Sequence, residues 1–415
     1  MKRYESYKDS SVKWLGEIPG HWEVIRLKAL LIERIEKNNN KENLIILSLL
    51  KDKGIIPYDE KGAIGNNSKE DLSQYKIARK GDLVINSMNV IIGSVGITQY
   101  DGYISPAYYS FKPRGIINLI YYYYLMTLRS VQQSIRCYSK GIMEIRLRIT
   151  SNDFLFMPFP FPPKSEQTAI ANYLDSVTSK IDKAISQQQK MIDLLNERKQ
   201  IIIQNAVTKG LDPNAKMKDS GVEWIGEIPE NWEVRRIKNS CKIINKKSTD
   251  NLPYIELDNI ESKSGKLLSY SNNRPDSICN HFDKGDILFC KLRPYLAKCI
   301  ITGVEGKCSS ELLVLRHFLG DQKYFQYLLL SPKLIDLINE STYGAKMPRA
   351  NWSYIGNCII PIPSLEEQKS IINYLDSFTS YIDSSISQCN KMISLLQERK
   401  QIIINDSVIG KIKVV

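Results

Sequence analysis

Each half of the chain carries a glycine-led loop with basic side chains, groups that hydrogen-bond to base edges and to phosphates. The first loop, residues 140–146, reads KGIMEIR, and the second, residues 343–349, reads YGAKMPR. Arginine and lysine can pair with guanine O6 and N7, and asparagine with adenine N6 and N7. A leading glycine lets backbone come close to a bound duplex. These residue types predict surfaces that contact nucleic acid.

Further amide, hydroxyl and basic side chains follow a Gly-Asp strand in each half, at residues 81–86 and 285–290. Polar side chains on loops that a strand supports are the groups that base reading requires. The alternative for each residue is a surface group that contacts a phosphate or nothing. The candidates are Asn86, Ser87, Asn89, Lys140, Gly141, Arg146 and Arg148 in the first half, and Lys291, Arg293, Gly344, Lys346 and Arg349 in the second.

Motifs for catalysis are missing. No G-x-x-x-x-G-K-[ST] phosphate loop occurs, since residues 303–308 (GVEGKC) are two residues short and end in cysteine. Neither a G-x-G-type cofactor loop nor an [ND]-P-P-[YF] base clamp is present. Pro275-Asp276 with residues 305–307 (EGK) resembles a nuclease triplet, but the first half has no counterpart. His21, His281 and His317 have no clustered partners in the sequence, which disfavours histidine acid–base chemistry. We therefore expect no catalytic, cofactor or metal site in this chain.

The chain is internally duplicated. Residues 9–28 and 219–238 are identical at 13 of 20 positions, and residues 166–203 and 367–404 at 27 of 38. The segments between these matched ends have diverged. A repeat of about 200 residues is far longer than the units of a solenoid, roughly 20–50 residues. Constant ends around variable middles predict one frame that carries two different binding domains.

Composition and charge indicate a folded protein with a polyanionic partner. The net charge is +12, of which residues 1–162 contribute +7. Phosphate contacts supply most sequence-independent affinity for DNA, although a solvated basic surface is the simpler alternative. No apolar run is long enough to span a membrane, and no signal peptide follows the first residues. The eight cysteines lack C-x-x-C spacing and do not follow the repeat, so we expect buried thiols and a cytoplasmic location.

The longer repeat predicts two helices of about 40 residues, each on the order of 60 Å long. Apolar residues step by four and three along each copy, which is a heptad stripe, and proline precedes each helix. Ser165 and Ser364 are the expected N-caps. We predict that the two helices pair as an antiparallel coiled coil; the alternative is that each lies alone against its own domain. The expected seam is Ile170, Leu174, Val177, Ile181 and Leu195 with Ile371, Leu375, Phe378, Ile382 and Leu396.

The two variable segments read as α+β. Strands are predicted at residues 43–49, 82–86, 154–159 and 358–361, between clusters of glycine, asparagine, serine and proline. Helices are predicted at residues 117–128 and 322–330. The run Tyr121–Tyr124 could suggest base stacking, but consecutive helical residues point in different directions, which favours core packing.

In combination these motifs resemble the specificity subunit of a type I restriction–modification system. They are the GEIP-x-x-W-E-V entry, the Gly-Asp strand, the glycine-basic loop, the proline stop, and the E-Q-x-x-I-x-x-Y-L-D helix that ends E-R-K-Q-I-I-I, all present twice. The resemblance implies two α/β target-recognition domains in tandem, joined by two long helices. The expected parts are target-recognition domain 1 (1–162), helix 1 (163–207), a linker (208–218), target-recognition domain 2 (219–361), helix 2 (362–409) and a tail (410–415).

The resemblance also implies partners and cofactors. Each recognition domain would read half of a bipartite, gapped site in double-stranded DNA, and the coiled coil would set the spacing and dock two adenine methyltransferase subunits. Restriction and translocase subunits would complete the complex. S-adenosylmethionine, ATP and Mg²⁺ would belong to those partners. Two alternatives remain open: a subunit of a methyltransferase–nuclease fusion system, and a scaffold that binds protein rather than DNA.

Overall fold

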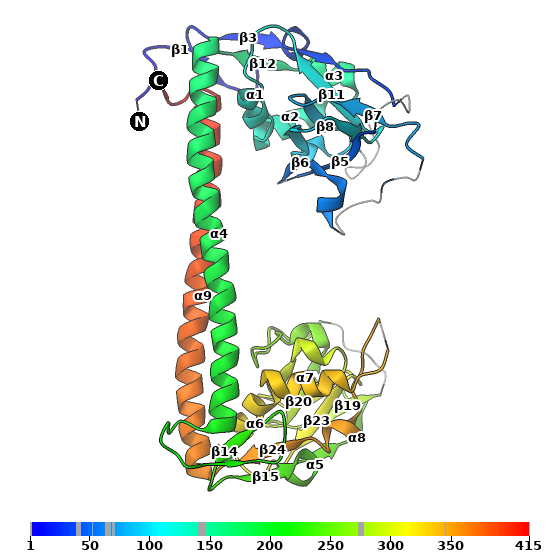
Figure 1. The fold of residues 1–415 in the computed structure, drawn as a ribbon, viewed down its shortest axis with the longest axis vertical. Coiled ribbons are helices and arrows are strands. Elements are labelled where there is room, and N and C mark those ends of the chain that lie inside the picture. Colours follow the sequence, from blue (N-terminus) through cyan, green and yellow to red (C-terminus); the bar gives the residue numbers. More distant parts are fainter. Residues whose placement is uncertain are drawn as a thin grey trace. The chain divides into compact units, whose positions relative to one another are not determined.

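A computed structural model describes residues 2–38, 43–51, 53–62, 68, 71–139, 147–272, 278–344 and 346–414. The chain forms two compact units, each with one α+β domain and parts of two long helices (Figure 1). Unit 1 comprises residues 1–187 and 392–415, and unit 2 comprises residues 188–391. The predicted fold class is confirmed. Among the described helices, none has a stretch apolar and long enough to cross a membrane.

The domain of unit 1 is built from two four-stranded sheets, ordered β6-β5-β10-β7 and β4-β11-β8-β9, with the small pairs β1-β2 and β12-β3. Its strands are β1 (Tyr7–Asp9), β2 (Glu17–Pro19), β3 (Glu23–Arg26), β4 (Leu31–Glu33), β5 (Ile45–Leu50), β6 (Gly54–Pro57), β7 (Lys76–Ala78), β8 (Leu83–Asn86), β9 (Val95–Ile97), β10 (Gly102–Ile104), β11 (Tyr108–Pro113) and β12 (Pro158–Phe161). Its helices are η1 (Leu27–Ala29), η2 (Tyr58–Lys61), η3 (Val90–Ile92), α1 (Leu119–Met126), α2 (Arg129–Tyr138) and α3 (Ser151–Leu155).

Unit 2 repeats this plan, with sheets β16-β23-β20-β21 and β17-β19-β22-β18 and the pairs β13-β14 and β15-β24. Its strands are β13 (Met217–Asp219), β14 (Glu227–Pro229), β15 (Glu233–Arg236), β16 (Lys242–Ile244), β17 (Lys247–Ser248), β18 (Tyr254–Ile255), β19 (Cys279–Phe282), β20 (Ile287–Cys290), β21 (Cys299–Ile301), β22 (Gly306–Cys308), β23 (Leu312–Arg316) and β24 (Ile359–Ile362). Its short helices are α5 (Ile237–Ser240), η5 (Leu257–Asn259), η6 (Pro294–Leu296), α6 (Gln322–Leu329), α7 (Pro332–Glu340) and α8 (Trp352–Ile355).

The Gly-Asp strands lie at the centre of each domain. Every residue of β8 and β20 is buried, which explains why both read as continuous apolar runs rather than alternating ones. Burial also raises the pKa of the Cys290 thiol to about 11, so it stays protonated. None of the eight cysteines forms a disulfide; six are buried, Cys389 is half-buried and Cys137 is exposed, so the prediction of buried thiols is wrong for Cys137.

Aromatic residues of α1 fill the core of unit 1. Tyr121 and Tyr122 are fully buried and Tyr124 nearly so, which confirms the prediction of core packing. The Tyr121 hydroxyl donates to the carbonyl of Val408, and in unit 2 the Tyr324 hydroxyl donates to that of Val207. Each hydroxyl thereby satisfies a carbonyl at the end of a long helix, where no backbone partner exists.

The strand predicted at residues 154–159 begins only at Pro158. Residues 151–155 instead form α3, because the Thr150 hydroxyl accepts a hydrogen bond from Asp153 N and caps a helical turn. Phe154, read from sequence as a strand residue, is buried in the core from this turn.

The two long helices are α4 (Lys164–Lys209) and α9 (Leu365–Val408). In unit 1 the start of α4 shares one core with the end of α9, and Lys400 Nζ donates to both carboxylate oxygens of Asp182 at 2.7 Å. In unit 2 the equivalent pair is Lys199 Nζ with Asp383 Oδ1 at 2.6 Å. The antiparallel pairing is therefore confirmed, and each helix end also packs into its own domain.

The buried stripe keeps the seven-residue repeat, but one of its two positions lies one residue later than predicted. Ala171, Thr178, Ile192 and Lys199 are buried at one position of the heptad, with half-buried Ile185 between them. Met191, which the predicted register places in the seam, is 50% exposed, whereas Ile192, expected on an outer face, is 7% exposed. The matching positions of α9, 372, 379, 386, 393 and 400, are buried or half-buried. Of the predicted seam, Val177, Leu195, Phe378 and Leu396 are half-buried and the other six residues are buried.

The helix starts differ between the copies. Ser364 caps α9 as predicted, because its Oγ accepts from Glu367 N while Glu367 Oε2 accepts from Ser364 N. In the first copy α4 begins at Lys164, so Ser165 lies inside the helix and the predicted cap is wrong. The tail follows α9 back to the start of the chain, where Lys413 N donates to the carbonyl of Lys2 at 2.8 Å.

Candidate nucleic-acid interface

In unit 1 the turn after β8 is fixed by backbone hydrogen bonds to two other segments. Ser87 N donates to the carbonyl of Ala107 at 3.1 Å, and Ile149 N donates to the carbonyl of Ser87 at 3.1 Å. The second bond places Arg148 beside this turn, although about 60 residues of sequence separate them. The structure thus brings together two of the predicted groups.

Unit 2 builds the same arrangement from different side chains. Lys291 N donates to the carbonyl of Glu311 at 3.0 Å, and Ala350 N donates to the carbonyl of Lys291 at 2.9 Å. Arg293 N donates to the carbonyl of Pro348 at 2.7 Å, so the turn after β20 is also joined to the 343–349 loop. Equivalent backbone bonds with different side chains allow two sites of one shape to contact different groups.

Not all predicted residues are accessible. Asn86 and Ser87 are buried, and Asn86 Oδ1 accepts a hydrogen bond from Met88 N, which is a turn-forming contact. Arg148 and Asn89 are exposed, as are Arg293, Gly344 and Lys346, whereas Lys291 and Arg349 are half-buried. Lys140, Gly141 and Arg146 lie outside the described residues. The accessible groups therefore gather at the turns and loops rather than on the strands.

Arg349 is already paired. Its guanidinium donates to both carboxylate oxygens of Glu311, at 2.9 and 3.1 Å, and these bonds raise its pKa above the usual arginine value. A guanidinium has five N–H donors, and this fork uses two. Arg349 can therefore contact a ligand with its remaining N–H groups while Glu311 fixes its orientation.

Arg148 adds to a basic surface in unit 1. Burial lowers the pKa of Lys76; the charge of Glu33 opposes this shift, and the charge of Arg148 adds to it. Lys76 Nζ donates to the carbonyl of Tyr108 at 2.9 Å and lies 4.5 Å from the ring centre of Tyr109. Two neighbouring cations with few acidic neighbours favour an anionic ligand at this surface.

A buried carboxylate stands directly before each of the strands β8 and β20 and pairs with an arginine, a feature that the sequence analysis did not identify. Asp82 accepts from Arg34 at 2.5 and 3.0 Å, and Asp286 accepts from Arg316 with two bonds of 2.6 Å. These bonds raise the pKa of both arginines. Arg34 directly follows β4 and Arg316 ends β23, so the two arginines come from different places in the repeat. The repeated Gly-Asp dipeptide was the available signal for the aspartates.

Exposed apolar side chains adjoin the cations, and these too were not among the predicted residues. Met88 is 51% exposed in unit 1, and Tyr343 and Met347 are 64% and 53% exposed in unit 2. Apolar groups can contact the thymine methyl group, the one apolar feature of the major groove. Their position beside Arg293 and Lys346 is consistent with a surface that contacts base edges as well as phosphates.

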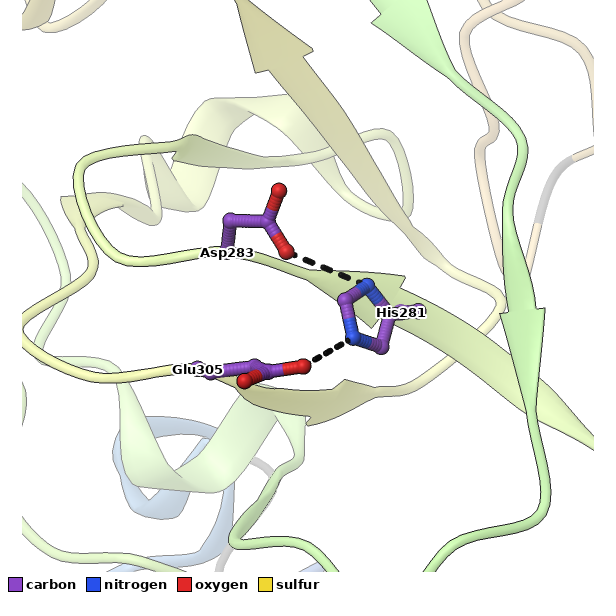
Figure 2. A group of neighbouring side chains, drawn as sticks. All are labelled: His281, Asp283 and Glu305. Atoms are coloured by element: carbon purple, nitrogen blue, oxygen red, sulfur yellow. Dashed lines mark hydrogen bonds and ion pairs between the residues drawn. The ribbon is translucent and has the colours of Figure 1, made fainter.

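His281 has clustered partners in space, contrary to the expectation from sequence. Figure 2 shows its ring between two carboxylates: Nε2 is 2.8 Å from Glu305 Oε1, and Nδ1 is 3.6 Å from Asp283 Oδ1. Each ring nitrogen faces a different carboxylate, and a metal ion would use the lone pair of only one nitrogen. Arg316 Nη1 also pairs with Asp283 Oδ2 at 2.6 Å. The hydrogen bond between His281 and Glu305 therefore links β19 to the residue before β22. Asp276 of the suggested nuclease triplet lies outside the described residues.

Comparison with known proteins agrees with the duplicated fold. The family described as "Type I restriction modification DNA specificity domain" matches residues 19–191 and again residues 229–394. The MjaVIII specificity subunit of a type I restriction enzyme from Methanocaldococcus jannaschii is 25% identical, over 98% of this chain and 97% of that protein.

Two solved structures share the fold. A chain from a structure on complex assembly and conformational transition of the type I R-M system has a TM-score of 0.72 at 15% identity, over 95% of this chain and 99% of that one. The HsdS subunit from Thermoanaerobacter tengcongensis has a TM-score of 0.53 at 15% identity, over 95% of this chain and 98% of that one.

Proposed function

The chain belongs to the type I restriction–modification DNA specificity family, and we propose that it is the DNA-recognition subunit of such an enzyme. Each variable segment, residues 1–162 and residues 219–361, would read one half of a bipartite, gapped site. The observation that carries this proposal is the pair of equivalent turns, one in each unit, that present different exposed side chains on the same backbone bonds.

In unit 1 the proposed contacts come from Asn89 and Arg148, and in unit 2 from Arg293, Lys346 and Arg349. Lys140, Gly141 and Arg146 precede Arg148 in the sequence, and their contacts with DNA stay predictions. Different side chains on one frame support an asymmetric site, because each base pair presents its own donor and acceptor pattern in the major groove.

The long helices would set the spacing between half-sites and bind adenine methyltransferase subunits. Each unit exposes one apolar stripe on a long helix, at helical spacings of three and seven residues. About half of each side chain in these stripes is exposed: Met191, Leu194 and Ile201 in unit 2, and Met392, Leu395 and Ile402 in unit 1. Equivalent stripes, one per unit, support two methyltransferase subunits per chain.

The methylation and restriction reactions would be catalysed by the partner subunits. Specificity subunits of this family are non-catalytic, and S-adenosylmethionine would be bound by the methyltransferase subunits and ATP and Mg²⁺ by the restriction and translocase subunits. The complex would act in the cytoplasm, where its DNA substrate is. Among the described residues, the one cluster of metal-binding residue types is that of His281, whose nitrogens face separate carboxylates.

Single-molecule methylome sequencing of the host, with and without a disrupted gene, tests the proposal. We expect one gapped, bipartite methyladenine motif to disappear on disruption and to return when the gene is restored. An unchanged methylome in cells that express the chain and its neighbouring methyltransferase would refute the recognition function and favour a protein-binding scaffold.

A further inference from the structure

The second variable segment is attached to its helices at one place that has no counterpart among the described residues of the first. In both segments a tyrosine of the domain donates to an aspartate of the adjoining helix: Tyr124 to Asp175 Oδ1 at 2.7 Å, and Tyr327 to Asp376 Oδ1 at 2.5 Å. These bonds anchor each domain near the start of its helix.

The extra attachment involves Asp383, seven residues further along α9. Asp383 Oδ1 accepts from Lys199 of α4 at 2.6 Å, and Oδ2 accepts from Lys266 of the domain at 2.5 Å. Seven residues of helix correspond to about 10 Å, so the second point lies well away from Asp376. Because the domain is attached to α9 at two separated residues, it resists rotation about either attachment.

The loop that carries Lys266 is itself fixed to the domain. Residues 261–266 form a turn in which Glu261 N donates to the carbonyl of Lys266 at 3.0 Å. The buried side chain of Gln326, on α6, donates to the carbonyl of Gly265 at 3.1 Å, and Lys263 N donates to that of Ala297. Motion of Lys266 is therefore coupled to motion of the whole domain.

The space between this loop and the helices is mostly polar. A cavity of about 690 Å³ lies between them, and Ile386 is the one apolar residue among the described residues that line it. Burial would raise the pKa of Asp383, but hydrogen bonds from Lys199 and Lys266 outweigh it and lower that pKa. The bridge is thus an ionised contact across a polar gap rather than apolar packing.

Unit 1 has no matching bridge in the part of the chain that the structure describes. Asp182, the equivalent of Asp383, bonds there to Lys400 of α9, the equivalent of Lys199, and to no group of its domain. The chain thereby contains its own control, because the helix-to-helix pair is present twice and the domain-to-helix pair once.

From this asymmetry we infer that Lys266 is a positioning residue, which through Asp383 fixes the second variable segment on its helices and so narrows the range of spacer lengths that the subunit accepts. This inference rests on the proposed function. It assigns to Lys266 no contact with DNA.

The test measures adenine methylation by the assembled methyltransferase complex on the bipartite site found by methylome sequencing. The DNA substrates carry the natural spacer and spacers one base pair shorter and longer. Lys266→Met removes the charge and keeps the length of the side chain. Asp182→Asn is the control, because it breaks the helix-to-helix pair of unit 1 and no bond to a domain among the described residues.

For Lys266→Met we expect the methylation rate on altered spacers, relative to the natural one, to rise roughly two- to five-fold, the range for a partly exposed ion pair. Asp182→Asn should leave this ratio unchanged. A ratio unchanged in Lys266→Met, or raised equally in Asp182→Asn, would overturn the inference. If the wild-type complex does not methylate a bipartite site, the proposed function itself fails.

Hydrogen exchange of the free chain gives a readout that needs no DNA. The amides of residues 261–266 should exchange faster in Lys266→Met, with those of the β20 strand unchanged. Equal exchange in both proteins would show that the bridge does not hold the loop and would also overturn the inference.

Discussion

The observed register of the seam predicts opposite effects for two adjacent residues of α4. Ile192 is 7% exposed and Met191 is 50% exposed, although the register predicted from the sequence would require the reverse. We compare Ile192→Ala with Met191→Ala; both remove a large apolar side chain and both retain a good helix former.

The expected magnitudes follow from burial. Truncation of a buried isoleucine costs about 2–4 kcal/mol, because the lost transfer free energy adds to the cost of the cavity. Unit 2 spans about 200 residues, so a change of 1 kcal/mol shifts its midpoint by about 2–4 °C. Ile192→Ala should therefore lower the melting temperature of that unit by about 5–15 °C. Met191→Ala should change its stability by less than about 0.5 kcal/mol.

Binding of the partner should show the opposite order. Met191 belongs to the proposed methyltransferase-binding stripe, so Met191→Ala should weaken co-purification of the methyltransferase and leave the melting curve in place. Differential scanning calorimetry of the isolated chain and pull-down of the complex measure the two effects. If Met191→Ala proves as destabilising as Ile192→Ala, the observed register of the seam is wrong and the register predicted from the sequence is restored.

Three further outcomes are expected. Arg293→Ala should slow methylation of the bipartite site about 10- to 100-fold, the range for one lost base contact of 1–3 kcal/mol, and leave the melting temperature unchanged; unaltered methylation would remove Arg293 from the interface. Ser87→Ala should leave the methylated motif intact, because Ser87 Oγ is buried and has no hydrogen-bond partner among the described residues; a changed motif would contradict this assignment. Burial would raise the pKa of Glu166, but hydrogen bonds from His21, Tyr4 and Trp22 outweigh it and lower that pKa. The ionised carboxylate therefore stabilises the folded state above the ordinary glutamate pKa of about 4.3, and this stabilisation is lost as pH falls through the lower pKa of the folded state. Glu166→Gln should therefore flatten the acid limb of the stability curve of unit 1, and an equally steep limb in both proteins would count against it.

The duplicated frame could be predicted from the sequence because its signals are long. A helix of more than 40 residues repeats its apolar stripe many times, and the matched ends fix where each copy begins. The error lay in the register: apolar residues occupy both position 191 and position 192, and only the burial of Ile192 and the exposure of Met191 show which of them the heptad seam includes.

The interface could be predicted only as a set of residue types. Composition indicates which side chains can pair with bases, but it does not show which of them turn inward. Asn86 is buried as the last residue of β8, and Ser87 is buried where its backbone bonds to Ala107 and Ile149. The Glu311 partner of Arg349 and the Asp383 partner of Lys266 lie 38 and 117 residues away in the chain. Ion pairs between residues so far apart in the sequence produce no pattern of spacing from which they could be predicted.

One contact in the frame bears on how new specificities arise. Gln167 and Gln368, at the starts of the long helices, each hold the adjoining domain through backbone atoms: their oxygens accept from Asn118 N and Asp321 N, and their amides donate to the carbonyls of Pro162 and Pro363. A backbone amide is offered by almost any residue, so this attachment makes few demands on the sequence of the domain. Recombination between genes could therefore exchange a whole variable segment at its constant ends, and the hybrid would inherit a working joint together with a new DNA target.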